Sequence, residues 1–105
     1  MNTKKSGTRK FLEKLTSGPL TIGRLLSSAR KCEEETLAQF AKRIGVTVSH
    51  LSDIENGRKT VSPERAARFA RALGLSEKQF IRVALQDELN RQGLKRFQVS
   101  IEEAA

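Results

Sequence analysis

The chain has 105 residues, which suits one domain, and 37% of them are apolar, enough for a small core. Twenty lysine and arginine residues against 12 aspartate and glutamate residues give a net charge of +8, which favours a polyanionic partner such as nucleic acid or an acidic lipid surface. The single cysteine excludes a disulfide framework and a structural zinc site. With one histidine, no tryptophan and no tyrosine, the chain has few of the usual catalytic side chains.

The sequence also argues against a membrane or secreted protein. No stretch approaches the roughly 20 apolar residues of a membrane span. The first 15 residues are basic, but no apolar stretch follows them as it does in a secretory signal. We therefore expect a cytoplasmic protein that is not an enzyme, has no catalytic residues and requires neither a cofactor nor a metal.

The positive charge is concentrated at the start of the chain. Residues 1–31 carry eight basic side chains and one acidic side chain. Within them, residues 1–8 are too polar to pack and predict a disordered basic arm. Residues 9–16 predict a short helix, which Gly18 and Pro19 would end.

Regular helical signals begin at Thr21. Four apolar residues then recur at the spacing of one buried helix face, namely Ile22, Leu25, Leu26 and Ala29. After the acidic residues 33–35, Thr36 and Gln39 fit a capping box that starts a second helix. Gly45 would end this helix after about eight residues.

A third helix follows a tight turn at residues 45–47. Thr47 is placed to cap this helix, and Gly57 is placed to end it in a left-handed conformation. Its predicted inward residues are Val48 or Leu51, then Ile54.

Two longer helices are expected next. Ser62 and Pro63 form a strong helix start, and Gly74 is a stop. Ser76 and Gln79 offer a second capping box. The helix that it opens carries Phe80, Ile81, Ala84, Leu85, Glu88 and Leu89, and Gly93 would end it.

The last segment changes period. Phe97, Val99 and Ile101 alternate with polar residues and predict a short, half-buried β-strand. A lone strand cannot satisfy its own backbone groups, so it must pair with something. We therefore predict an all-α fold, in which a five-helix domain spans residues 19–92. Residues 1–18 form a basic arm and short helix before it, and residues 93–105 form a strand and tail after it.

Residues 36–57 carry the most informative pattern, because they encode two short capped helices joined by a tight turn. Helices of eight to ten residues are not stable alone, so the flanking helices must hold them at a fixed angle. Such an arrangement lets the second helix enter the major groove of DNA while the first lies across the backbone.

One set of residues is in register with a known family, with unbroken spacing from Arg30 to Gly57. These residues are Leu26, Arg30, Thr36, Phe40, Ala41, Gly45, Val46, Thr47, Leu51, Ile54, Glu55, Asn56, Gly57, Ala72, Leu73 and Gly74. Through them, roughly residues 21–81 resemble the helix-turn-helix domain of the phage-repressor (Cro-type, XRE) family. The resemblance implies a five-helix, lambda-repressor-like bundle that binds double-stranded DNA and is usually a homodimer.

The resemblance also implies roles for individual residues. Positions that face base edges are occupied by Val48, Ser49, Ser52 and Asp53, with His50 beside them on the flank. Positions that contact phosphate are occupied by Thr47, Asn56, Arg58 and Lys59. Arg30 and Glu55 match an ion pair that braces the motif, although an exposed pair would be worth under about 1 kcal/mol.

Three departures from the family pattern weaken DNA binding. Leu37 replaces a glutamine that often contacts phosphate, and Glu34 and Glu35 add negative charge beside the motif. The recognition helix also lacks Arg, Lys, Asn and Gln before Asn56, and these are the best readers of guanine and adenine. Specific binding would then depend on dimerisation, phosphate contacts and the basic arm. In that arm, the residues that either follow the DNA or merely add solubility are Lys4, Lys5, Arg9 and Lys10.

Two further patterns leave alternatives open. Arg65, Arg68 and Arg71 form a solvated face, a second DNA contact or a site for an acidic partner. A dimer or partner surface is expected on Ile81, Leu85, Leu89, Phe97, Val99 and Ile101. That surface would serve a symmetric dimer or the addition of the strand to another protein, unless the strand folds back on its own bundle.

Three functions follow from these observations. The first is a dimeric, sequence-specific transcriptional repressor. The second is an antitoxin that represses its own operon and neutralises a partner toxin through its C-terminal segment. The third is an interaction module whose helix-turn-helix no longer binds DNA, an idea supported only by the acidic residues and the poor recognition helix.

Overall fold

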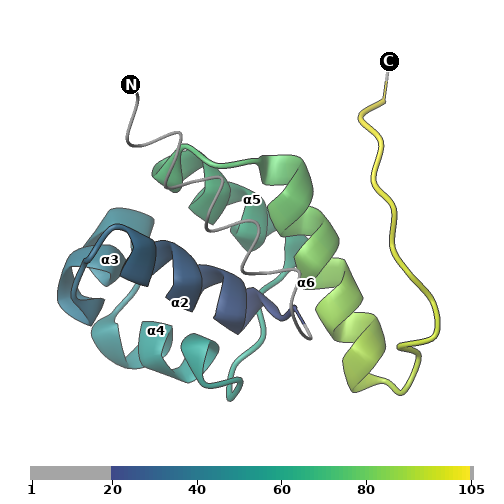
Figure 1. Cartoon of the computed structure of the whole chain (residues 1–105), viewed down its shortest axis with the longest axis horizontal. Helices are drawn as coiled ribbons and strands as arrows, with labels where there is room; N and C mark the ends of the chain where they lie inside the picture. The colour runs from purple at the N-terminus through teal and green to yellow at the C-terminus, as the bar shows by residue number, and fades with distance from the viewer. Residues whose placement is uncertain (1–19, 105) are drawn as a thin grey trace.

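The structure is a computed structural model that describes residues 20–104. Five helices lie within these residues, followed by an extended segment (Figure 1). They are α2 (Ile22–Cys32), α3 (Leu37–Ile44), α4 (Val48–Glu55), α5 (Pro63–Leu73) and α6 (Glu77–Arg91). The predicted run of five helices is therefore present. The predicted basic arm and the short helix over residues 9–16 lie outside the described residues.

Each of these helices begins at a hydroxyl side chain that accepts a backbone hydrogen bond from the third helical residue. This bond satisfies one of the amides that a helix start leaves without a partner. The five caps are Thr21, Thr36, Thr47, Ser62 and Ser76. Thr36 and Gln39 form a complete capping box. Gln79 does not return the bond to Ser76, because its side-chain oxygen accepts from Arg82 instead.

The helices enclose one core. α5 packs against α6, α2 contacts both α4 and α6, and α3 contacts α4 and α5. The largest fully buried side chains come from α2, α3, α4 and α6, namely Ile22, Leu25, Leu26, Phe40, Leu51, Ile54, Phe80 and Val83. The two short helices α3 and α4 are therefore held by their neighbours, as their length requires.

α2 and α4 approach so closely at one point that only glycine fits. A Cβ atom added to Gly23 would lie 2.3 Å from the carbonyl oxygen of Ile54 and 3.1 Å from that of Glu55. Interiors are close-packed, so a side chain here would force the two helices apart. No local pattern in the sequence indicates this contact.

The buried face of α6 includes a carboxylate. Phe80, Val83, Ala84 and Asp87 are buried, and Val83 and Asp87 are absent from the set expected for this helix. The Asp87 carboxylate accepts a hydrogen bond from the backbone amide of Ile22 at 3.4 Å. It therefore lies at the N-terminal end of α2, where the helix dipole favours a negative charge.

The predicted C-terminal strand is wrong, because the described residues contain no β-strand. After α6 the chain turns and runs back alongside this helix (Figure 1). The Gln86 side chain donates to the carbonyl oxygen of Phe97 and accepts from the amide of Val99, both at 2.8 Å. One amide side chain thus supplies two bonds that a strand partner would have made. Phe97 is 52% exposed, whereas Val99 and Ile101 are half-buried, so the alternation reflects one-sided packing rather than a sheet.

Candidate nucleic-acid interface

The turn between α3 and α4 has the three residues expected. Gly45 has a φ of +77°, in the left-handed region that glycine adopts without steric cost. The amide of Val46 donates to the carbonyl oxygen of Ala41 at 3.0 Å, and Thr47 then caps α4. The chain therefore ends one helix and starts the next within a single turn.

α4 has an inward and an outward face. Leu51 and Ile54 have no exposed surface, whereas Val48 is 45% exposed. Ser49, next to it in the first turn, is also exposed, and Ser52 in the next turn is half-buried. The start of α4 therefore presents a small apolar group and a hydroxyl to the outside of the bundle.

Arg30 and Glu55 tie the end of α2 to the end of α4. Two nitrogens of the guanidinium donate to the two carboxylate oxygens, each at 2.9 Å. A third nitrogen donates to the carbonyl oxygen of Glu35 at 3.2 Å. The bond to Glu55 raises the pKa of Arg30, although burial opposes this shift. The pair thus fixes α4 against α2 and against the loop before α3.

Asp53 and Arg58 form an ion pair across the end of α4. Nε of Arg58 donates to the Asp53 carboxylate at 2.9 Å, and the side chains are 61% and 29% exposed. The backbone amides of Arg58 and Lys59 also donate to the carbonyl oxygen of Asp53, at 2.8 and 3.3 Å. One predicted base-facing residue therefore holds a predicted phosphate-contacting residue.

Asn56 is similarly engaged within the motif. Its side-chain nitrogen donates to the carbonyl oxygen of Ser52 at 2.8 Å and lies 3.5 Å from the Ser52 hydroxyl. Thr47, also predicted to contact phosphate, uses its hydroxyl to cap the amide of His50. Lys59 is exposed in the loop after α4.

His50 faces α5 rather than the outward face of α4. Its ring nitrogen Nε2 lies 3.2 Å from a terminal nitrogen of Arg65, and the side chain is half-buried. The Arg65 guanidinium also lies over the ring of Phe69, 5.6 Å from its centre. His50 thus links α4 to α5.

Comparison with known protein families gives one match for this part of the chain. A helix-turn-helix family model matches residues 29–80, about half of the chain, from the end of α2 to the start of α6. The match includes α3, the turn and α4. The protein belongs to the XRE-type helix-turn-helix family. A comparison with curated proteins finds no match.

Membership of the helix-turn-helix family makes the protein a DNA-binding transcription regulator rather than a member of an enzyme family. α4 is the second helix of this motif, the one that is called the recognition helix in helix-turn-helix proteins. Within residues 20–104, no helix is long and apolar enough to cross a membrane.

The acidic triplet before the helix-turn-helix is partly neutralised. The Glu35 carboxylate pairs with Arg43 on α3, and its side chain is only 15% exposed. Glu33 and Glu34 are exposed in the loop between α2 and α3. The negative charge of this loop therefore comes from two side chains rather than three.

The three arginines on α5 each have a partner within the chain. Arg65 contacts His50, Arg68 lies 3.7 Å from Glu64, and Arg71 donates to Glu77 at 2.8 Å. Arg68 and Arg71 are exposed, whereas Arg65 is half-buried, so only the first two lie on a solvated face. A second DNA contact or an acidic partner for this series stays a prediction.

The arm residues Lys4, Lys5, Arg9 and Lys10 lie outside the described residues. Sequence reasoning missed Gly23, Arg43 and the contact of Arg65 with His50. No local pattern in the sequence indicates any of the three, because each depends on how separate segments pack.

Proposed function

We propose that the protein is a dimeric repressor that places the first turn of α4 in the major groove. The observation that supports this proposal is the outward face of α4. Val48 and Ser49 are exposed at the start of this helix, whereas Leu51 and Ile54 on its other face are buried in the core. In helix-turn-helix proteins, residues at the start of the recognition helix contact base edges. Val48 suits a thymine methyl group, and Ser49 and Ser52 suit a base donor or acceptor.

The loop after α4 would contact the DNA backbone. Arg58 and Lys59 are exposed there, and a pair of cations at this position suits two phosphates. The ion pair with Asp53 favours a role for Asp53 in orienting Arg58 over a role in contacting cytosine. Because these contacts carry little sequence information, two copies of the motif would be needed for specific binding.

The dimer surface would lie on α6 and the segment after it. Ile81, Leu85 and Leu89 form a half-buried stripe outside the buried face of α6. Phe97 is one of two exposed large apolar side chains among the described residues. Burying these side chains against a second copy would remove apolar surface from water.

Selection of bound sequences from a random DNA pool, at two salt concentrations, tests this function. We expect an inverted repeat whose half-site centres lie about 34 Å apart, one helical turn of DNA. Salt-sensitive binding without any enriched sequence would contradict specific recognition and leave only a charge-driven contact.

A second candidate function is that of an antitoxin. The observation that favours it is the segment after α6, which is extended and whose backbone is bonded to the rest of the bundle through the Gln86 side chain. Such a segment can be released to a partner protein at little cost in contacts. A toxin encoded beside the gene should then be neutralised by the full chain but not by residues 1–93. Equal neutralisation by both would contradict a role for the C-terminal segment.

A further inference from the structure

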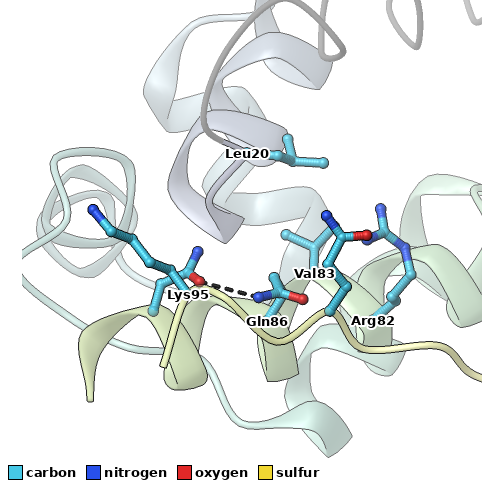
Figure 2. A pocket seen from close by; sticks show the side chains of 7 residues that line it. Leu20, Arg82, Val83, Gln86 and Lys95 are labelled. Carbon is cyan, nitrogen blue, oxygen red and sulfur yellow. Dashed lines mark hydrogen bonds between the residues drawn. The ribbon is translucent and has the colours of Figure 1, made fainter. Parts of the chain in front are cut away.

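A polar cavity lies outside the helix-turn-helix motif. It has a volume of about 240 Å³ and lies between Leu20, α6 and the segment that follows α6 (Figure 2). It is lined by Leu20, Arg82, Val83, Gln86, Asn90, Lys95 and Gln98. None of these residues falls within the family match at residues 29–80, so the shared DNA-binding function does not explain the cavity.

The lining of this cavity is positively charged. Among residues 20–104, its lining contains Arg82 and Lys95 but no carboxylate. Among the described residues neither cation forms an ion pair, and Arg82 has only a 3.3 Å bond to the Gln79 side chain. Asp87, which adjoins the lining residue Gln86, is turned toward the backbone of Ile22. Within the described part of the chain, these two charges therefore have no anionic partner.

The lining also has more free hydrogen-bond donors than acceptors. The Gln86 side-chain amide already has partners within the chain, because it donates to Asn90 and Phe97 and accepts from Val99. The lining groups that form no hydrogen bond with residues 20–104 are the terminal nitrogens of Arg82, the Lys95 ammonium group and the side-chain nitrogens of Asn90 and Gln98. A guanidinium, an ammonium and two amide nitrogens match the oxygens of a carboxylate or phosphate group.

We propose that this cavity binds a small organic polyanion. Figure 2 shows Lys95 and Arg82 at opposite ends of the cavity, with Gln86 between them, so anionic groups at the two ends of a ligand would each meet a cation. Leu20 and Val83 provide an apolar surface for the carbon skeleton between them. The volume is below the roughly 300–1,000 Å³ of sites for drug-sized ligands, which fits a metabolite with a few carboxylate or phosphate groups.

A titration of the full chain with citrate, and separately with 3-phosphoglycerate, tests this site. Amide signals of the ¹⁵N-labelled protein are followed by NMR at constant ionic strength. We expect at least one probe to cause saturable shifts confined to Leu20, to residues 82–98 and to the side-chain amides of Asn90 and Gln98. Arg82→Gln combined with Lys95→Gln should weaken this binding about tenfold or more, because it removes charge-assisted hydrogen bonds.

The matched control removes the same charge elsewhere. Arg68→Gln with Lys42→Gln also deletes two exposed cations, one on α5 and one on α3, and neither lines the cavity. This variant should bind the probe within about twofold of the original protein, since distant exposed charges are screened. Equal weakening in both double variants, or shifts that never saturate and spread over all cations, would overturn the proposal. It would also be overturned if duplex DNA shifted residues 82–98 and neither probe did. That result would mark a second nucleic-acid contact.

Discussion

At the scale of single residues, a substitution of Gly23 tests the close contact between α2 and α4, because helix propensity and packing predict opposite changes in stability. Helix propensity alone would make Gly23→Ala stabilising by up to about 1 kcal/mol. The new methyl group would lie 2.3 Å from the carbonyl oxygen of Ile54, and such overpacking costs about 1–3 kcal/mol. We expect a net loss of stability, seen as a lower urea midpoint at an unchanged slope. A more stable variant would mean that α2 and α4 are not in close contact.

Arg30 and Glu55 test whether the brace between α2 and α4 contributes to stability. We expect Arg30→Met and Glu55→Gln, made singly and together, to give a coupling of about 1–2 kcal/mol in the free energy of unfolding. The reason is that the bond is bidentate and the side chains are only 16% and 8% exposed. The exposed pair of Arg68 and Glu64 is the control and should give under about 0.5 kcal/mol.

The raised pKa of Arg30 fixes the pH dependence of this brace. Folding favours the charged guanidinium, so its contribution is complete below the unfolded-state pKa of arginine. It is lost only as the pH rises through the still higher pKa of the folded state. The coupling free energy between Arg30 and Glu55 should therefore stay constant from neutral to mildly alkaline pH. A loss of coupling in that interval would show that the group that titrates is not Arg30.

At the scale of elements, the loop after the recognition helix tests how Asp53 acts. If Asp53 orients Arg58, then Asp53→Ala should leave the base preference of the selected sequence unchanged. It should also have no added effect on DNA affinity once Arg58→Ala is present, because residues that act as one unit are not additive. Arg58→Ala itself should reduce the slope of log affinity against log salt by about 1. A changed preference at one base pair would instead place Asp53 against a base.

The backbone of the segment after α6 makes two hydrogen bonds with one side chain of α6, and this leads to a second prediction for an element. Gln86→Ala removes both bonds to the backbone of Phe97 and Val99. We expect faster hydrogen exchange at the Val99 amide with little change in the melting temperature, because the buried face of α6 is untouched. Gln92→Ala, which loses only a bond to Glu88, is the control. Unchanged exchange at Val99 would show that other contacts hold the segment.

Comparison of these elements shows what the sequence could and could not predict. The helix ends were predictable because they are encoded within three or four residues, as in the capping box of Thr36 and Gln39. The contact of Gly23 with Ile54 and the burial of Asp87 depend on residues far apart in the chain, so no local pattern contains them. The prediction of a strand was wrong because alternation indicates that one side of a segment is buried, but not whether a β-sheet or another element covers that side.

In the candidate site, too, local features were predictable from the sequence and long-range contacts were not. The register of the family motif placed Val48 and Ser49 at the start of the recognition helix, where the structure has them exposed. Their contact with bases stays a prediction. The same register did not reveal that His50 turns to Arg65, because α5 is fixed against α4 only in the folded bundle.

At the scale of the whole molecule, the charge distribution makes dimerisation important for DNA binding. Residues 32–62, which contain the helix-turn-helix, carry four basic and five acidic side chains. Non-specific attraction to phosphate depends on positive charge, so this part of a single chain would bind weakly. Joining two copies makes the second half-site contact intramolecular and can raise affinity about 100-fold or more.

Leu85→Glu tests the dimer directly. Leu85 is at the centre of the half-buried stripe on α6, with Ile81 one turn before it and Leu89 one turn after it. A carboxylate there would be buried without a partner in the interface. We expect a monomer by sedimentation equilibrium, and a loss of about 100-fold in affinity for an inverted repeat but not for a single half-site. Lys78→Glu makes a larger charge change at an exposed position of the same helix and should leave the dimer intact. A dimer that survives Leu85→Glu would move the interface away from α6, and Phe97→Ser would then show whether the segment after α6 forms it alone.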